Sequence, residues 1–221
     1  TQPLATALEA LGEAEIRVGR PGDAIPLFNR GLDIARKAAA TQPQAELPQK
    51  RLVDFYDLLG RAHSQTGQTN IALGYLQDEL KIARRLAEHS SSYLDKRNVA
   101  IVLSRLSDLH SRMGQTQKAR DSMAEALAAF KEIADAQPND TQSGDDYAQA
   151  LIGIAQLDFR MGRPRGGVDS YQQALAVYRR IVAREPDNAF YRRRLATALS
   201  ELGFALLQME RPDEAMKHAA E

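Results

Sequence analysis

The stretch LSRLSDLHSRMGQTQKAR, residues 103–120, joins two amphipathic segments through a glycine, Gly114. That glycine has counterparts along the chain, at Gly19, Gly67 and Gly162. The intervals are 48, 47 and 48 residues, and a further 48 residues lead to Glu210. A frame that returns at a fixed period predicts a chain built from repeated structural units.

Small residues recur at two fixed distances from this glycine, and we call each set of equivalent positions a column. An apolar residue and a small one precede the glycine by seven or eight positions, at Leu11-Gly12, Leu59-Gly60, Leu106-Ser107, Ile154-Ala155 and Leu202-Gly203. A small residue follows it by five positions, at Ala24, Ala72, Ala119, Gly167 and Ala215. Small side chains allow two antiparallel helices to approach closely. A large side chain in place of Ala119 should therefore push its helix away from its neighbour.

The spacing of apolar residues between these columns predicts helices. Apolar side chains recur at steps of three and four residues, which indicates amphipathic helices and not strands. First helices are expected at about 3–18, 47–66, 94–113, 144–161 and 189–209, and second helices at about 21–40, 69–88, 116–136 and 165–184, with a stub from 212. The column glycine suits the left-handed stop of a first helix, and Pro21, Pro164 and Pro212 lie near second-helix starts.

These observations predict an all-α fold, a right-handed superhelical solenoid of antiparallel helix pairs, because such pairs cannot bury their apolar faces alone. Four full repeats and a truncated fifth are expected, at about 3–45, 46–92, 93–142, 143–187 and 188–221. They should form a single domain over residues 1–221. Because the chain starts without Met and ends within a helix, we expect a fragment of a longer protein.

At these columns the sequence resembles the tetratricopeptide repeat (TPR). The pattern L-G…G…A-x3-F is visible as Leu11-Gly12, Gly19, Ala24 and Phe28. The column that holds Trp in the family contains Leu8, Tyr56, Leu103, Leu151 and Leu199. The period of about 48 residues exceeds the usual 34, so the helices should be longer. The sequence is similar to a long-helix variety that, in bacterial multidomain signalling proteins, is attached to serine/threonine kinase, caspase-like or TIR effectors.

The composition excludes several classes of function. Lys plus Arg and Asp plus Glu are equal at 29 each, so no overall basic field attracts nucleic acid or anionic lipid. No nucleic-acid or membrane partner is therefore expected, and no apolar run approaches the roughly 18 residues of a membrane span. The absence of Cys excludes disulfides and thiolate sites and fits a reducing, cytoplasmic location.

No pattern indicates catalysis. Phosphate-loop, dinucleotide-binding, zinc-protease and serine-hydrolase motifs are all missing, and MGRPRGG at 161–167 is interpreted as a turn between helices. His63 and His110 share one column with Asp158. We interpret the histidines as half-buried substitutes for an aromatic residue, because a metal would need converging ligands. We expect no enzyme activity, no cofactor and no metal.

Arginines are dense from Arg160 to Arg194. The favoured interpretation is a solvated face with cations near helix C-termini. The alternative is a patch for an acidic partner or a phosphopeptide, because guanidinium groups bind carboxylates and phosphates in a forked geometry.

The resemblance implies that the first helices line a concave groove that binds protein or peptide. Carried onto this sequence, the groove residues are Glu13, Arg17, Arg61, Gln65, Asp108, Arg112, Gln156, Phe159, Arg160, Phe204 and Gln208. The groove would be polar in the N-terminal repeats and apolar towards the C-terminus, where Phe204 and Leu207 could instead pack against a missing next repeat. The Lys and Asn clamp that some family members use on acidic chaperone tails is not matched, since the first repeat offers Glu9 and Glu13.

The function expected from these features is a non-catalytic scaffold for protein interactions, attached to a signalling effector such as a serine/threonine kinase. Two alternatives stay open. One is self-association through the array ends or autoinhibition of that effector, and the other is a peptide-sensing regulator.

Overall fold

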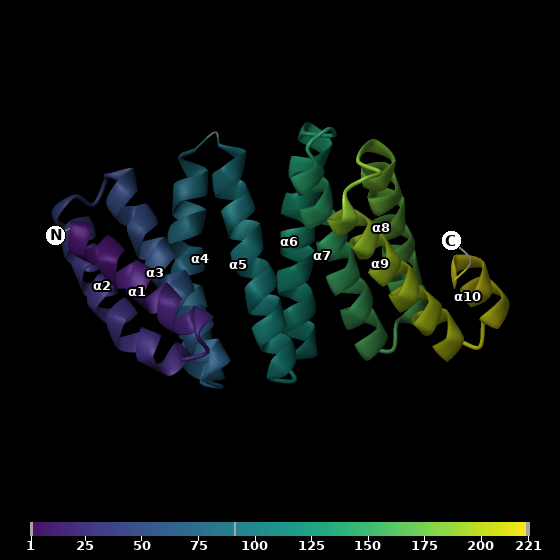
Figure 1. Ribbon diagram of the computed structural model, residues 1–221, viewed down its shortest axis with the longest axis horizontal. Coiled ribbons are helices and arrows are strands. Elements are labelled where there is room, and N and C mark those ends of the chain that lie inside the picture. The colour runs from purple at the N-terminus through teal and green to yellow at the C-terminus, as the bar shows by residue number, and fades with distance from the viewer. Residues whose placement is uncertain (1, 91, 220–221) are drawn as a thin grey trace. The chain divides into compact units, whose positions relative to one another are not determined.

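The structure of the chain is a computed structural model that describes residues 2–90 and 92–219. Those residues form ten α-helices and no strand (Figure 1). The helices are α1 Gln2–Arg17, α2 Pro21–Thr41, α3 Glu46–Gln65, α4 Thr69–Glu88, α5 Tyr93–Arg112, α6 Thr116–Ala136, α7 Thr141–Arg160, α8 Pro164–Arg184, α9 Ala189–Gln208 and α10 Pro212–Ala219. The predicted all-α fold of paired helices is confirmed.

The helices belong to two compact units, residues 1–113 and 114–221. In the first unit each helix from α1 to α5 packs against the next, and in the second unit the same holds from α6 to α10. The prediction of one domain over residues 1–221 stays a prediction, and its ends, residues 1 and 220–221, lie outside the described residues.

Left-handed residues end the first helices. Positive φ angles are found at Gly19, Gly67, Gly114 and Gly162, as predicted for the column glycine. After α1, the Gly19 amide donates to the Ile16 carbonyl at 3.0 Å and the Arg20 amide donates to the Glu15 carbonyl at 2.9 Å. This hydrogen-bond pair is a Schellman motif, which satisfies carbonyl groups that the helix end leaves without partners.

Glu210 takes the same position after α9, with a φ of 57°. The amide of Arg211 donates to the carbonyl of Leu206 at 3.0 Å, so the hydrogen bonds match those of the glycine sites. In the described part of the chain, Glu210 is the one non-glycine residue with positive φ. Its Cβ makes this conformation unfavourable.

Side chains also determine where helices begin. Asn188 precedes α9 and its side chain accepts a hydrogen bond from the Phe190 amide at 3.1 Å, as expected for an N-cap. The predicted start of α7 at residue 144 was wrong by three residues. Asp140 caps that helix by accepting from the Ser143 amide at 2.9 Å, so the residues between Thr141 and Gly144 are helical and do not form a turn.

Most residues of the small-residue columns are buried. Ala24, Ala72 and Ala119 have no exposed surface. A Cβ added to Gly12 would lie 2.3 Å from the ring of Phe28, which is fully buried between α1 and α2. The prediction that small residues permit close approach is therefore confirmed at Gly12 and also at Gly167, where an added Cβ would lie 2.5 Å from the ring of Phe159. It does not hold at Gly203, where an added Cβ would meet no described atom within 4 Å.

Apolar side chains from consecutive hairpins share buried clusters within each unit. In the first unit, Phe28 of α2 and Phe55 of α3 belong to a single buried cluster. In the second unit, Tyr178 of α8 and Leu202 of α9 do the same. Each of α3, α7 and α9 is therefore covered by the second helix of the preceding hairpin as well as by its own partner.

Glu210→Gly should stabilise the protein by about 0.5 to 1 kcal/mol, because glycine removes the Cβ strain of the left-handed conformation. Gly67→Ala should destabilise it by about 1 kcal/mol. At Gly67 an added Cβ would meet no described atom within 4 Å, so that loss would come from the backbone alone. Chemical denaturation measures both changes. Equal stabilities for Glu210→Gly and wild type would contradict the assignment of backbone strain to Glu210.

Ala119→Leu should destabilise the protein by about 1 to 3 kcal/mol, because a fully buried site has no room for a larger side chain. Ala128→Leu is the matched control, since residue 128 lies on the exposed face of the same helix. Urea unfolding of the two variants measures the difference. A tolerated Ala119→Leu would contradict the assignment of residue 119 as a site without room for a larger side chain.

Candidate functional site

The predicted groove residues lie on first helices in both units, and each side chain is exposed or partly exposed. The first unit holds Glu13 and Arg17 on α1, Arg61 and Gln65 on α3, and Asp108 and Arg112 on α5; the second holds Gln156, Phe159 and Arg160 on α7, and Phe204 and Gln208 on α9. As binding residues they stay predictions, but their surroundings differ between the units.

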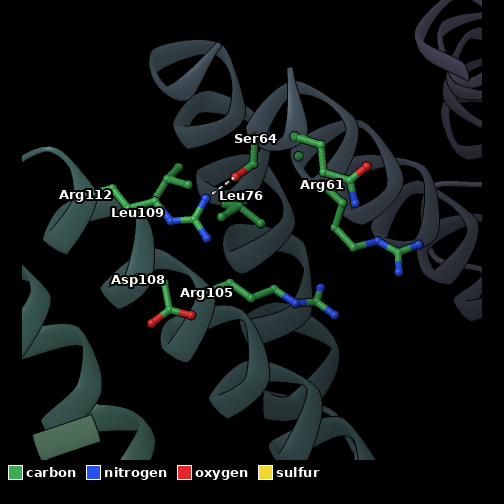
Figure 2. A pocket seen from close by; sticks show the side chains of 9 residues that line it. Arg61, Ser64, Leu76, Arg105, Asp108, Leu109 and Arg112 are labelled. Carbon is green, nitrogen blue, oxygen red and sulfur yellow. Dashed lines mark hydrogen bonds between the residues drawn. The ribbon is translucent and has the colours of Figure 1, made fainter. Parts of the chain in front are cut away.

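In the first unit, four of the six predicted residues line one pocket of about 230 Å³. The four are Arg61, Gln65, Asp108 and Arg112. The remaining lining comes from Gly60, Ser64, Leu76, Arg105 and Leu109, so that α3, α4 and α5 all contribute (Figure 2). Glu13 and Arg17 do not line it. We call this cavity the α3–α5 pocket.

Two apolar side chains and a glycine form the floor of the α3–α5 pocket. Leu76 of α4 and Leu109 of α5 are buried. A Cβ at Gly60 would lie 3.1 Å from a methyl group of Leu76, so a larger residue there would crowd the floor. Figure 2 shows the polar side chains of Ser64, Arg61, Arg105 and Arg112 around Leu76.

Three arginines and one aspartate line the pocket, which leaves a formal charge of +2 on its wall. Arg112 donates to the Ser64 hydroxyl at 3.3 Å. In the described part of the chain Arg112 has no carboxylate within ion-pair distance. Arg61 is partly compensated, because its Nε lies 3.3 Å from Asp57 Oδ2.

The third arginine, Arg105, connects the pocket wall to a buried carboxyl group. Its Nη1 donates to Asp57 Oδ1 and lies 3.8 Å from Glu79 Oε1. Glu79 of α4 is 2% exposed, and its Oε2 has no hydrogen-bond partner among the described residues. Burial raises the Glu79 pKa to about 8, and the nearby negative charge of Asp57 adds to this rise, whereas Arg105 and Arg61 oppose it. Glu79 is therefore mostly uncharged at neutral pH and cancels little of the charge of Arg105.

Sequence reasoning missed both Arg105 and Glu79. Arg105 lies three residues before Asp108, so helical spacing places the two on one face of α5. Glu79 occupies the apolar stripe of α4, three residues after Leu76 and four before Ala83. A charged residue in such a stripe is a signal for a buried titratable group.

In the second unit the predicted groove residues have different contacts and exposures. Phe159 is half-buried, with its ring centre 6.2 Å from that of Tyr171, and it packs against the core. The side-chain amide of Gln156 donates to Glu201 at 3.2 Å. Phe204 and Leu207 are exposed by 65% and 56%. These two apolar residues are the accessible part of the predicted groove on α9.

The arginine-rich stretch of the second unit contains side chains with structural partners. Arg184 donates to the Pro138 carbonyl at 2.7 Å. Arg194 lies 3.6 Å from Asp145 Oδ1 and stacks over Phe190. Arg180 and Arg184 line a second pocket of about 180 Å³. Its wall also contains Asp135 and Asp140, so its formal charges balance.

The histidine column is more buried than the half-buried interpretation assumed, and that part of the prediction was wrong. His63 and His110 are buried, and so is Asp158. The His63 ring stacks on Tyr75 with 5.4 Å between ring centres, which replaces an aromatic contact. Asp158 pairs with Arg120 Nε at 2.6 Å. Among the described residues, no group of three or more His, Cys, Asp or Glu could hold a metal ion.

Within residues 2–90 and 92–219, no helix combines the length and the apolar character that crossing a bilayer requires.

Comparison with known proteins confirms the fold. No family model matches the sequence, and a comparison with curated proteins gives no match. Among solved structures, BtubC (BKLC) from P. vanneervenii has a TM-score of 0.72 at 16% identity, over 99% of this chain and 80% of that one. MamA has a TM-score of 0.61 at 17% identity, over 100% of this chain and 90% of that one.

A third similar structure belongs to a larger protein. It is a Signal Transduction ATPase with Numerous Domains from Pyrococcus horikoshii that carries a tetratricopeptide repeat sensor. The TM-score is 0.69 at 14% identity, over 96% of this chain and 29% of that one. At such identities the likeness establishes the TPR-like fold of helix pairs, as the resemblance in sequence implied.

Stability should fall as the pH rises from about 5 to 8, because Glu79 has a higher pKa in the folded chain, about 8, than its ordinary value of 4.5. In that range the folded state keeps a proton that the unfolded state has released, so rising pH favours unfolding. Glu79→Gln should reduce the loss between pH 6 and 8 by about 1 to 2 kcal/mol.

Urea unfolding at the two pH values measures this slope. Asp78→Asn, at the exposed position next to Glu79, is the control and should keep the wild-type slope. An unchanged slope in Glu79→Gln would show that another group causes the pH dependence.

Proposed function

We propose that this chain is a non-catalytic scaffold that binds a peptide segment of a protein partner at the α3–α5 pocket and the surrounding first-helix surface. One observation carries the proposal. Four residues that the family resemblance assigns to a binding groove, Arg61, Gln65, Asp108 and Arg112, line the same cavity although they come from two different helices.

The size of the pocket favours a peptide over a small ligand. Sites that enclose small molecules have volumes of roughly 300–1,000 Å³, whereas the α3–α5 pocket measures about 230 Å³. Such a cavity suits one anchoring side chain of a longer segment, whose neighbouring residues contact the open surface around it. This argument favours a peptide ligand, which a scaffold and a peptide-sensing regulator would share.

The chemistry of the wall fits binding and gives no reason to expect catalysis. The one hydroxyl group of the lining, Ser64, accepts a hydrogen bond from Arg112. No histidine lines the pocket to act as its base, so the arrangement of a nucleophile with an adjacent base is missing from this wall. Arginine, glutamine and serine instead supply hydrogen-bond donors for recognition.

The wider context is part of the proposal. The array would be attached to a signalling effector, such as a serine/threonine kinase, in the cytoplasm of a bacterium. The sequence resemblance supports this, and so does the similar Pyrococcus horikoshii structure, in which a tetratricopeptide repeat sensor belongs to a signal-transduction ATPase. The array would select the partner and the effector would act on it.

Self-association is a second candidate, supported by the outer face of α1. Leu4 and Leu11 are 45% and 52% exposed. The residues 48 positions later, Leu52 and Leu59, are buried. A second copy could cover the α1 face in the way that α2 covers α3. A molar mass of a dimer or larger assembly, measured by light scattering, would favour this candidate.

The scaffold is tested with a phage-displayed library of random 12-residue peptides, selected on the immobilised protein. Selected peptides should bind with a Kd of about 1 µM, or about −8 kcal/mol, as read by fluorescence anisotropy. Arg112→Glu should weaken them at least tenfold. Arg30→Glu, at an exposed position of α2 outside the pocket, should leave binding unchanged.

Both variants must have the wild-type unfolding temperature for the comparison to count. Equal binding to Arg112→Glu and wild type would overturn the α3–α5 pocket as the binding site. A library that returns no binding peptide would overturn the scaffold function for this part of the chain.

A further inference from the structure

The charge of the α3–α5 pocket departs from that of the rest of the molecule. The whole chain has equal numbers of acidic and basic residues and a formal net charge of zero. The residues that line the pocket carry +2, while the second pocket, beside Arg180 and Arg184, is balanced by two aspartates. Outside the lining, Asp57 pairs with Arg61 and Arg105, and Glu13 lies 4.0 Å from Arg61. Arg112 is therefore the lining arginine whose charge is least compensated among the described residues. A local excess of positive charge around a cavity favours an anionic occupant.

The donors that face the α3–α5 pocket are not used up within the protein. A guanidinium group has five N–H donors, and Arg112 uses its Nη1 on Ser64 Oγ at 3.3 Å. The hydroxyl of Ser64 accepts that bond and keeps its own hydrogen for a ligand. The side chain of Gln65, in the same wall, is exposed and adds an amide donor.

The other two arginines are held in place before any ligand arrives. Asp57 pairs with both, through Oδ2 to Arg61 and Oδ1 to Arg105. Groups that are fixed in advance lose less conformational entropy when they bind. The orientation of Arg105 is held from α3 and from the Glu79 side of α4, and that of Arg61 from its own helix.

The floor of the pocket makes these charges more effective. Leu76 and Leu109 expose 3% and 4% of their surface, so a group that enters leaves water for an apolar base. Hydrogen bonds to a charged group are stronger in such surroundings than in water. The methylene groups of an acidic side chain could lie on the same two leucines.

We propose that the α3–α5 pocket is an anion subsite, which takes one carboxylate or phosphate group of the bound peptide between Arg61, Arg105 and Arg112. This inference rests on the proposed scaffold function for the identity of the ligand, but the anion site itself is tested without a peptide. The acidic group anchors the segment, and the residues on either side of it contact the open surface.

The first experiment is an NMR titration of the arginine Nε–H signals with inorganic phosphate and, separately, with N-acetylglutamate amide. Sodium chloride at equal ionic strength is the control. The signals of Arg112 and Arg61 should shift to saturation with at least one of the two anions, and these shifts should vanish in Arg112→Gln. The signal of Arg30 should not move. Signals that respond to chloride as they do to both anions would overturn the anion subsite.

The second experiment is a double-mutant cycle with a peptide from the library selection. Replacing its acidic residue by Gln should weaken binding about tenfold or more, and Arg112→Gln should do the same. The two changes together should cost little more than either alone, because they remove the same contact. A phosphoserine at that peptide position identifies the source: tighter binding than Glu indicates phosphate, and weaker binding indicates carboxylate.

The outcomes separate the two proposals. Peptides that depend on Arg112 but bind equally with Glu, Gln or phosphoserine would overturn the anion subsite and leave the scaffold standing. Saturable anion shifts with no selected peptide would leave the subsite standing and overturn the scaffold. Selected peptides that contain no acidic residue would also count against the subsite.

Discussion

The hairpin of α3 and α4 has apolar side chains that it cannot cover by itself. Phe55 of α3 is fully buried, and it reaches this state by packing against Gly31 of the preceding hairpin, where an added Cβ would lie 2.2 Å from its ring. Within a hairpin, the same demand brings Phe28 against Gly12. Close approach of helices at small residues is therefore the condition on which the cores of both units depend.

This packing also places polar side chains of successive first helices side by side. Three contacts of the first unit join residues that are 48 positions apart, and all three involve the surface around the α3–α5 pocket. They are Arg105 with Asp57, Arg112 with Ser64 and Arg61 with Glu13. The same register that stacks the apolar faces thus builds a polar wall from α1, α3 and α5. A binding surface of this kind can change its chemistry without changing its fold, because its side chains lie outside the core.

The α3–α5 pocket includes an unfavourable feature, a buried carboxyl group next to its polar wall. Glu79 is buried with one oxygen that lacks a hydrogen-bond partner among the described residues, and its raised pKa reflects the loss of water around the charge. Arg105 and Arg61 offset part of this cost, whereas the negative charge of Asp57 adds to it. The contact between the buried carboxyl group of Glu79 and Arg105, which lines the cavity, restricts where the guanidinium group can point. Such a restriction prepares an arginine for recognition.

Much of the fold could be predicted from the sequence alone. The period of the glycines, the small-residue columns and the amphipathic spacing are local or strictly repeated, so helix positions follow from them to within three residues. Gly67 and Asn188 show why: a left-handed stop and an N-cap depend on the residue itself and a few neighbours. The identity of the first-helix surface followed from the family resemblance and not from this local chemistry.

The tertiary structure decided which of those surface residues share a cavity. Arg61 and Arg112 lie in different helices. The contact of Arg112 with Ser64 depends on how α3 and α5 pack, whereas Arg61 pairs with Asp57 within α3. It also decided that Glu79, which looks like an ordinary charged helix residue in sequence, is buried beside Arg105. Periodicity records which face of a helix is apolar. Charge, burial and pKa at one point arise from side chains that three helices bring together, and no single helix contains that information.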